Sequence, residues 1–466
     1  MPSLQPSPSN DNQDFDLDDL IESLQRAIER RIGRPERFED CERVALELSN
    51  EAVRRCLEAD LQRRSDELSA EILVDGLRHR RHQPGSVKYY SLCGTLRIKR
   101  WTYRLAGERN GPTKVALELA AGLVEGATPA MAYALAREYA QSPVRLVRDD
   151  LRASHRVPPS VATLDRMAKA IGTSVKQRAE RIENALRRSE LIPRQVVAVN
   201  LGLDRTTVPM QEEPEDAAAE RRCVVRYRMA YVGTVCLTDA DAQRLVTRKY
   251  AAPAHQGASG IIRRMLADVH RALEQNPRLR VGIVQDNAPE LWNLMRAAMR
   301  ADPILNEHGW RETVDWYHLF AYFGRVLAVL IDDDAKRFAL LERWKGTLAK
   351  SDRAIHAIRD WIDRTGFSLT DRKKRQEFIR VVGMYLVYAP HFRYASLKRL
   401  GLHRGSGVTE GACKSLITMR AKRSGQRWSR HGISAVLSLK SLLDSDRLPA
   451  FWNIFARRYG ARCSAA

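Results

Sequence analysis

The segment from residue 196 to residue 204, Val-Val-Ala-Val-Asn-Leu-Gly-Leu-Asp, strongly constrains what this chain can fold into. It is an apolar run rich in β-branched residues, which favours a strand buried on both faces. The run ends on a carboxylate, Asp204, and the following Arg205-Thr206-Thr207 predicts a polar turn. An acid at the end of a buried strand lies at the edge of a sheet, where mixed α/β domains form their sites.

A second apolar run has the same form. Residues 280–285, Arg-Val-Gly-Ile-Val-Gln, lead directly into Asp286. Two strands that each end on aspartate can bring both carboxylates to one rim and so assemble a divalent-metal site. An aspartate after a strand is more often a turn former or a helix cap. Here Asn287 and Glu290 have the spacing of a capping box, so we expect Asn287 to cap the next helix and Asp286 to be free for chemistry.

The net charge points to a polyanionic partner. The 466 residues include 78 Lys and Arg against 57 Asp and Glu, a formal net charge of +21. From residue 391 to the end, 15 Lys and Arg stand against three acids, so more than half of the excess lies in this last part. A uniformly basic surface can serve solubility alone, whereas this clustering favours a face that follows the phosphates of nucleic acid.

Other bulk features limit the class of protein. A hydrophobic content of 44% and a charged content of 29% are ordinary for a folded protein, and the length suits about two to four domains. No stretch is apolar enough to span a bilayer, so we expect no membrane partner and a cytoplasmic, nucleoid-associated location. Seven cysteines without a C-x-x-C pair predict neither a disulfide framework nor a zinc cluster.

The first part of the chain is expected to be mainly helical. Residues 1–22, with six acids and no base, predict a disordered acidic tail. Apolar residues at three- and four-residue steps predict a helical region over 23–85. Period-two alternation with interleaved arginines then predicts a β-hairpin over 86–113, which could either grip nucleic acid or present an ordinary solvated face.

A possible DNA-binding motif follows the hairpin. The pattern over 114–190 is helical, and two of its helices, 142–153 and 159–171, are separated by a short polar turn. The second could be the recognition helix of a helix-turn-helix, with Arg166 and Lys169 contacting DNA. Two helices joined by a turn are common in all classes of protein, so the pattern alone does not decide this.

The order of elements in the second half predicts the fold. Over residues 191–318 the order is strand, hairpin, helix, strand, helix, strand, which is that of an RNase H-like sheet. Residues 319–404 are helical and basic without a strand signal and predict an insertion, and 405–466 form a last, basic region. We therefore expect an α/β protein with an RNase H-like catalytic core, an all-helical insertion, and a mainly helical N-terminal region with a small β-hairpin.

A third acid follows the predicted insertion. Glycines over 405–411 predict a loop, and the next residues begin a helix with Glu410 in its first turn, where the helix dipole favours a glutamate in any case. Strong positive charge follows at once, which suits a site where phosphate and metal meet. The candidates for DNA contacts in this segment are Lys414, Arg420, Lys422, Arg423, Arg427 and Trp428.

Four short blocks carry a resemblance to a known family. They are Leu203–Pro209 (LDRTTVP), Val284–Ala288 (VQDNA), Asp315–His318 (DWYH) and Gly407–Lys414 (GVTEGACK), the last continued by Arg420 and Ser424–Ser429 (SGQRWS). With these blocks in this order, the chain resembles a bacterial insertion-sequence transposase of the DDE class, closest to the ISKra-type group and more distantly to Mutator-like transposases. The match covers roughly residues 190–455 and more loosely the N-terminal half. The cysteine-rich turn of many relatives is missing at 105–111.

The resemblance implies a function and a set of roles. It implies a DNA transposase that cleaves transposon ends and transfers their 3′-OH into target DNA, as a homodimer or higher oligomer on the DNA. Asp204, Asp286 and Glu410 would be the catalytic carboxylates that bind two Mg²⁺ or Mn²⁺ ions. Asp315 and His318 match an Asp-x-x-His signature, with His318 expected close to the scissile phosphate.

The chemistry of these residue types agrees with that function. Two hard cations about 4 Å apart can activate the attacking oxygen and stabilise the leaving one at a phosphodiester. Hard cations prefer carboxylate oxygens, and three acids held together repel strongly without metal. Two alternatives stay open: a transposase-derived DNA-binding protein that no longer cuts, and a metal-dependent nuclease or resolvase on the same fold.

Overall fold

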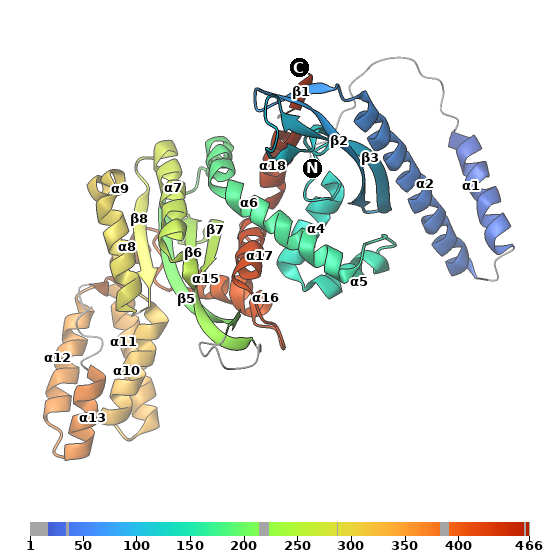
Figure 1. Cartoon of the computed structure of the whole chain (residues 1–466). Helices are drawn as coiled ribbons and strands as arrows, with labels where there is room; N and C mark the ends of the chain where they lie inside the picture. The colour runs from blue at the N-terminus through green and yellow to red at the C-terminus, as the bar shows by residue number, and fades with distance from the viewer. Residues whose placement is uncertain are drawn as a thin grey trace. The chain divides into compact units, whose positions relative to one another are not determined.

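Helices and two separate sheets make the chain an α/β protein, as the sequence predicts. A computed structural model describes residues 17–33, 37–213, 223–286, 288–382, 391–460 and 463–465. The chain divides by its contacts into two units, each with one sheet (Figure 1). Unit 1 comprises Met1–Ala132, Pro143–Met167 and Arg458–Ala466, and unit 2 comprises Tyr133–Ser142 and Ala168–Arg457.

Unit 1 is built on an antiparallel sheet of order β10-β1-β2-β3-β4. Its long hairpin pairs β2 with β3 and turns between Ser91 and Gly94. Helix α2 (Phe38–Glu67) lies along β3, and Leu61 packs there with Tyr89 and Ile98 in a small core. The strands are β1 (Glu71–Val74), β2 (Leu77–Ser91), β3 (Gly94–Leu105), β4 (Thr113–Lys114) and β10 (Cys463–Ala465).

Two predicted boundaries of unit 1 are wrong. The helical region expected over 23–85 ends at Glu67, because residues 71–91 form β1 and β2. Ile72 is buried there while Arg78 and Arg80 of β2 are exposed, so strands with one solvated, basic face looked like a polar helix. The acidic tail expected over 1–22 is also too long, since its end overlaps α1 (Leu17–Ile32), a helix that the amphipathic pattern over 17–32 predicts; residues 1–16 lie outside the described residues.

Residues 114–190 are mainly helical, as predicted. The helices are α3 (Ala116–Ala120), α4 (Pro129–Gln141), α5 (Val144–Ala153) and α6 (Val161–Ser189). Helix α6 is 29 residues long and extends well beyond the short recognition helix expected over 159–171. The helix-turn-helix therefore stays a prediction.

Unit 2 contains a mixed sheet of order β7-β6-β5-β8-β9. Strands β5, β6 and β7 are antiparallel neighbours, whereas β8 pairs parallel with β5, and β9 pairs parallel with β8. The strands are β5 (Ala198–Glu212), β6 (Val224–Thr238), β7 (Arg244–Pro253), β8 (Arg280–Gln285) and β9 (Arg311–Val314). The parallel half brings three chain segments to one level, where β8 and β9 end and β5 continues.

The predicted turn after Asp204 is wrong. Strand β5 continues to Glu212 and stays paired with β6 throughout, up to the pair Glu212 and Val224. Thr206, Thr207 and Val208 are β-branched and suit a strand, so their pairing with β6 outweighs their polarity. Asp204 therefore lies within a strand, at the level where the shorter neighbour β8 ends.

Helices cover both faces of the unit 2 sheet. A side chain at Gly233 of β6 would collide with Ile261 and Met265 of α7 (Ser259–Gln275), whereas one at Gly202 of β5 would collide with Thr409 of α15 (Gly407–Ala412). Adjacent to the edge strand β7 lies α17 (Arg430–Leu443), with contacts that satisfy backbone N–H groups of that edge. Further helices are α8 (Pro289–Ala301), α9 (Pro303–His308), α16 (Met419–Ala421) and α18 (Leu448–Gly460).

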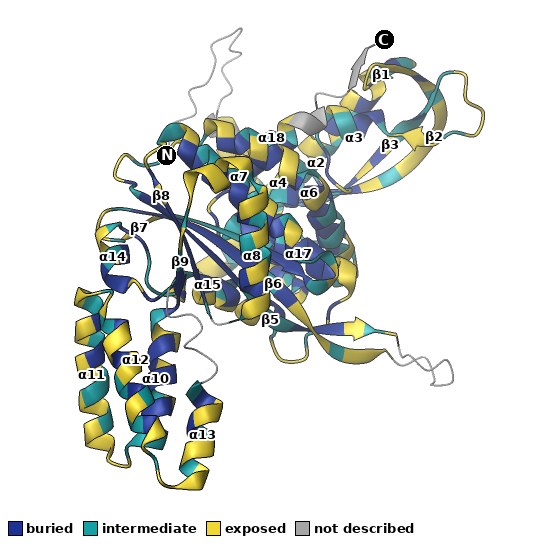
Figure 2. Cartoon of the chain, turned by 90° about the vertical axis from the view of Figure 1, so that its left-hand side faces the viewer, coloured by how far each residue is buried: buried dark blue, intermediate teal, exposed yellow. Residues whose placement is uncertain are grey.

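Between β9 and α15, the described residues contain helices and no strand. They are α10 (Trp316–Leu330), α11 (Asp334–Lys350), α12 (Ala354–Phe367), α13 (Arg372–Val382) and α14 (Tyr394–Arg399). Phe323, Trp344 and Trp361 pack edge to face and join α10, α11 and α12. Figure 2 shows buried residues on the inner sides of these helices and exposed ones outside. The helical pattern predicted over 319–404 is therefore confirmed for the described residues.

Candidate metal centre

Three aspartates lie at one level of the sheet: Asp204 within β5, Asp286 one residue beyond β8, and Asp315 one residue beyond β9. The parallel register pairs Leu201 of β5 with Ile283 of β8, and Gln285 of β8 with Val314 of β9. Continuing these registers aligns Asp204 with Asp286 and Asp286 with Asp315. Side chains at equal register point to the same face, and neighbouring strands lie about 4.8 Å apart. The sheet therefore brings three carboxylates into one row.

The carboxylate of Asp286 is clearly perturbed by its surroundings. Burial raises its pKa above the usual range, and the nearby charge of Asp204 raises it further. The backbone N–H of Ala288 donates to Asp286 Oδ1 at 3.1 Å and partly offsets both effects. Helix α8 begins at Pro289 with Ala288 at its N-cap position, and Asn287 lies outside the described residues. The expectation that Asp286 has no structural contact is therefore wrong.

Asp204 accepts a hydrogen bond from a cysteine that the sequence did not single out. The Cys413 thiol donates to Asp204 Oδ2 at 3.2 Å. Burial raises the pKa of this thiol above its usual range, and Asp204, Glu410 and Asp286 raise it further. One buried thiol thus lies close to all three predicted metal ligands. Its spacing of three residues from Glu410, one helical turn, was the only sequence signal for this.

Glu410 reaches the sheet because α15 packs directly on β5. The hydroxyls of Thr409 and Thr234 lie 2.8 Å apart and are both buried. A Cβ at Gly202 would lie 2.0 Å from the Thr409 hydroxyl, so only glycine permits this approach. Ser406 precedes the helix and its hydroxyl donates to Glu410 Oε1 at 2.6 Å. Glu410 lies in the first turn of a helix, as predicted, with its side chain half exposed.

A second set of metal donors overlaps the first. Oxygen or nitrogen atoms of Asp315, His318 and Glu410 all lie within 4.8 Å of one another, so this group could hold a metal ion. Asp315 is fully buried, caps α10 by accepting from His318 N at 2.7 Å, and holds the His318 ring through Nδ1 at 2.9 Å. The backbone N–H of Ser406 donates to its other oxygen. Asp315 thus orients His318 in addition to any contact with metal.

Two of the residues predicted to contact DNA are buried. Arg420 is 1% exposed, donates to the Tyr139 carbonyl at 2.8 and 3.0 Å, and stacks on the Tyr139 and Trp428 rings. Burial lowers the pKa of its guanidinium to about 10. Trp428 is 8% exposed and its indole N–H donates to the Ala421 carbonyl. Both residues stabilise this segment and are not available to DNA in this structure, a correction to the prediction.

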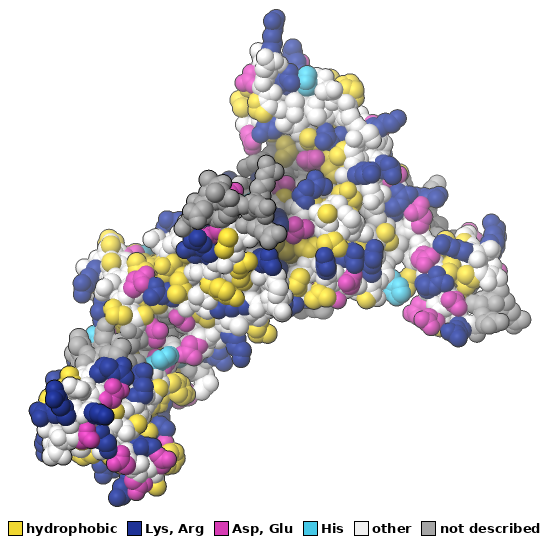
Figure 3. Space-filling model, turned by 60° about the horizontal axis from the view of Figure 1, so that its bottom comes forward, with side chains coloured by type: hydrophobic (Ala, Val, Ile, Leu, Met, Phe, Trp, Pro, Cys, Tyr) yellow, Lys and Arg dark blue, Asp and Glu magenta, His cyan; other side chains and the backbone are white. Residues whose placement is uncertain are grey.

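The other basic candidates differ in whether their side chains have partners within the protein. Lys414 and Arg427 are exposed, and within the described part of the chain neither side chain has a partner. Lys422 donates to the Thr206 hydroxyl at 2.8 Å, and Arg423 donates to backbone carbonyls. Figure 3 shows Lys and Arg spread over the visible face with Asp and Glu among them, so the charge does not form one stripe there.

The two candidates on α6 also differ. Arg166 is exposed, whereas Lys169 is half-buried and its Cε would lie 3.6 Å from a Cβ added at Gly432 of α17. Lys169 therefore contacts its own unit in addition to any role toward DNA.

Comparison with known proteins assigns no family to the chain. No protein-family profile matches the chain, and no curated protein matches it. Among the described residues, no helix combines the length and the apolar character needed to cross a bilayer.

Proposed function

We propose that the chain is a DNA transposase of the DDE class, which cleaves transposon ends and transfers their 3′-OH groups into target DNA with the help of divalent metal ions. The observation that carries the proposal is the gathering of Asp204, Asp286, Asp315 and Glu410 at one edge of the unit 2 sheet. Such a surplus of carboxylates is costly as architecture and useful as a metal site.

The topology of unit 2 supports an RNase H-like core. Three antiparallel strands are followed by two parallel ones on the other side of β5, in the order β7-β6-β5-β8-β9, with helices on both faces. The helices between β9 and α15 stand where the predicted insertion would lie. Each of these features agrees with the order of elements that the sequence predicted over residues 191–404.

The donor set fits Mg²⁺ or Mn²⁺. All three proposed ligands, Asp204, Asp286 and Glu410, offer hard carboxylate oxygens. Because burial and Asp204 raise the pKa of Asp286, ionising the whole group is unfavourable without a nearby cation. Two bound ions would make the attacking oxygen more acidic and stabilise the leaving oxygen at phosphorus.

The residues around these carboxylates have roles of their own. Asp315 holds His318 through Nδ1, so a neutral His318 carries its lone pair on Nε2 and could accept a proton, whereas a protonated one could donate to a phosphate oxygen. Lys414 and Arg427 are exposed and could contact the DNA backbone. Joining two transposon ends would require at least two copies of the chain.

The test compares Asp286→Asn with the wild-type chain on a plasmid that carries the DNA flanking this reading frame. We expect cleavage and strand transfer to fall about a thousand-fold or more, roughly 4 kcal/mol in activation free energy, while end binding is retained. Glu307→Gln removes an exposed charge elsewhere in unit 2 and should change neither. Full activity of Asp286→Asn contradicts the proposal, and loss of both activity and binding assigns Asp286 a structural role.

A metal-dependent nuclease is the second candidate, favoured by the compact Asp315, His318 and Glu410 group, which could hold a single ion sufficient for hydrolysis. A joining assay with pre-cleaved ends separates the two functions. A transposase joins such ends to target DNA, whereas a nuclease or resolvase of this kind gives no strand-transfer product. A transposase-derived binding protein would give neither cleavage nor joining.

A further inference from the structure

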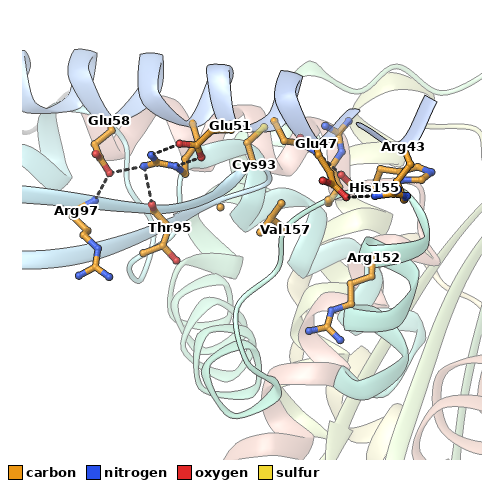
Figure 4. A pocket seen from close by; sticks show the side chains of 14 residues that line it. Arg43, Glu47, Glu51, Glu58, Cys93, Thr95, Arg97, Arg152, His155 and Val157 are labelled. Atoms are coloured by element: carbon orange, nitrogen blue, oxygen red, sulfur yellow. Dashed lines mark hydrogen bonds and ion pairs between the residues drawn. The ribbon is translucent and has the colours of Figure 1, made fainter. Parts of the chain in front are cut away.

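A polar groove of about 650 Å³ lies within unit 1, on the side of the sheet covered by α2. Its walls are α2, the turn between β2 and β3, and the segment 152–157 that follows from α5 (Figure 4). Arg97, Arg152 and Arg156 line it and are all exposed. In Figure 4 the side chains of Arg97 and Arg152 extend away from α2. Arg97 belongs to the hairpin that the sequence left open between gripping nucleic acid and a solvated face, whereas Arg152 and Arg156 were not among the residues that the sequence singled out as DNA contacts.

The acids of the groove are already neutralised. Each of its three glutamates is bonded to an arginine of α1 or α2: the glutamates are Glu47, Glu51 and Glu58, and their partners are Arg31, Arg43, Arg54 and Arg55. Within the described residues, by contrast, the guanidinium groups of Arg97, Arg152 and Arg156 have no partner. The groove therefore presents three unpaired positive charges whose only available partners are anions from solution.

Hydrogen bonds connect the three walls of the groove. Asn50 of α2 donates to the His155 carbonyl at 2.6 Å and so fixes the 152–157 segment. Arg54 donates to the Thr95 carbonyl, and Gly94 lets the turn approach it, since a Cβ there would lie 3.2 Å from Arg54 Cδ and φ is +128°. The backbone N–H of Val157 donates to the Leu92 carbonyl at 3.0 Å and links the other two walls. The three free arginines are thus carried by a rigid frame.

We propose that this groove binds the phosphodiester backbone of duplex DNA, with Arg97, Arg152 and Arg156 each contacting a phosphate. Planar guanidinium groups suit phosphate oxygens because their N–H donors match them two at a time. Contacts of this kind position DNA without reading its sequence. The inference goes beyond the proposed chemistry, because it assigns a binding role to unit 1 that does not depend on whether unit 2 cuts.

The experiment measures the affinity of the full chain for a fluorescently labelled duplex of unrelated sequence at several salt concentrations. Arg97→Ala, Arg152→Ala and Arg156→Ala should each reduce the slope of log affinity against log salt by about one, and the triple variant by about three. Arg109→Ala removes an exposed charge of the same unit outside the groove and should leave the slope unchanged. An unchanged slope in the triple variant overturns the proposal.

A second measurement detects occupancy without any substitution. Cys93 lines the groove and is partly exposed, so its alkylation rate should fall when duplex DNA is added, whereas that of Cys56, which does not line it, should not. Equal rates with and without DNA contradict the proposal. If polyglutamate protects Cys93 and duplex DNA does not, the groove binds an acidic polypeptide and the assignment to DNA is wrong.

The proposed function and the proposed DNA-binding groove can be tested independently of each other. Asp286→Asn should keep the wild-type salt slope and Cys93 protection, because Asp286 belongs to unit 2. If Asp286→Asn still cleaves DNA, the proposed function is wrong but the groove stands. If the triple variant binds normally, the groove is wrong and the function stands.

Discussion

Unit 2 contains two clusters of charged side chains that differ in burial and in charge balance. The first lies between α6, β7, α7 and the start of α18 and is deeply buried and balanced in charge. Arg187 donates to Asp268 at 2.7 Å, and Arg447 bonds both Asp268 at 2.9 Å and Glu190 at 2.5 Å. Each of its three carboxylates has guanidinium partners: Glu183, Glu190 and Asp268 with Arg187, Arg264 and Arg447, and with Arg248 as a further partner of Glu190. The second cluster is the row of aspartates with Glu410, where carboxylates outnumber cations.

The difference indicates what each cluster is for. In the buried network Tyr250 also donates to Asp268, so the charges are satisfied within the protein and need no ligand. At the carboxylate row, the charges of His318 and Arg205 lower the pKa of Asp286 but do not outweigh burial and Asp204, and Arg205 is itself bonded to Glu290. A balanced cluster stabilises the fold. An unbalanced cluster remains unfavourable until a cation binds.

The largest expected effect is on the balanced cluster. Arg447→Met leaves Asp268 and Glu190 without their main partner, and breaking a buried ion pair in this way costs about 3–5 kcal/mol. Denaturant unfolding should report this loss. Asp286→Asn should leave the free energy of unfolding unchanged or slightly raised, because it relieves repulsion. Equal destabilisation by both substitutions would remove the distinction between the clusters.

Divalent cations should stabilise the second cluster and not the first. At a Mg²⁺ or Mn²⁺ concentration about 100 times its dissociation constant, binding to the folded state contributes about 2.7 kcal/mol. Thermal unfolding should shift upward with metal in the wild-type chain and in Arg447→Met, and much less in Asp286→Asn. A shift that survives in Asp286→Asn and Glu410→Gln would place the metal elsewhere.

A smaller effect is expected where α15 meets β5. Gly202→Ala places a methyl group within 2.0 Å of the Thr409 hydroxyl, and overpacking of this kind costs about 1–3 kcal/mol. We expect DNA cleavage to fall by more than this stability loss explains, because Glu410 moves with the helix. Gly233→Ala, which faces α7 on the opposite side of the sheet, is the matched control for a crowded strand glycine. Similar cleavage by the two variants would contradict the role of Gly202.

Acidification should weaken the balanced cluster first. Burial alone would raise the pKa of Asp268, but Arg447 and Arg187 outweigh it, so the pKa lies below its usual range, and Arg447 lowers that of Glu190. A depressed pKa contributes stability above the unfolded-state value of about 4 that is lost as pH falls through the folded-state value. Unfolding free energies measured below neutral pH should therefore fall less steeply in Arg447→Met than in the wild-type chain. Parallel curves would mean that the pair does not set the acid response.

The sequence predicted those elements whose periodicity is strong. The buried part of β5 before Asp204, the strand β8 before Asp286, and the helices after Asp315 follow from apolar runs and helical spacing. The sequence failed to predict elements that depend on pairing between strands. Strand β5 continues past Asp204 because β6 lies beside it, and β1 and β2 replace an expected helix. Long-range partners are not visible in local composition.

The site was predicted unevenly for the same reason. The acids could be found because each follows a strand or begins a helix. The Cys413 thiol bonded to Asp204 depends on packing between segments more than 200 residues apart. Arg420 was mistaken for a DNA contact because a basic run gives no sign of which member turns inward to the Tyr139 carbonyl.

Glu410 owes its location to what it touches rather than to the stretch of chain that leads to it. The Thr409 hydroxyl bonds to that of Thr234, and the Ser406 N–H donates to Asp315. Thr409 also packs directly against the backbone of Gly202, which has no side chain. The residues just before the turn are tied to the same sheet, because His403 N donates to Asn200 and Leu402 lies against Gly282. The acid is therefore held by short-range contacts from both β5 and its neighbours.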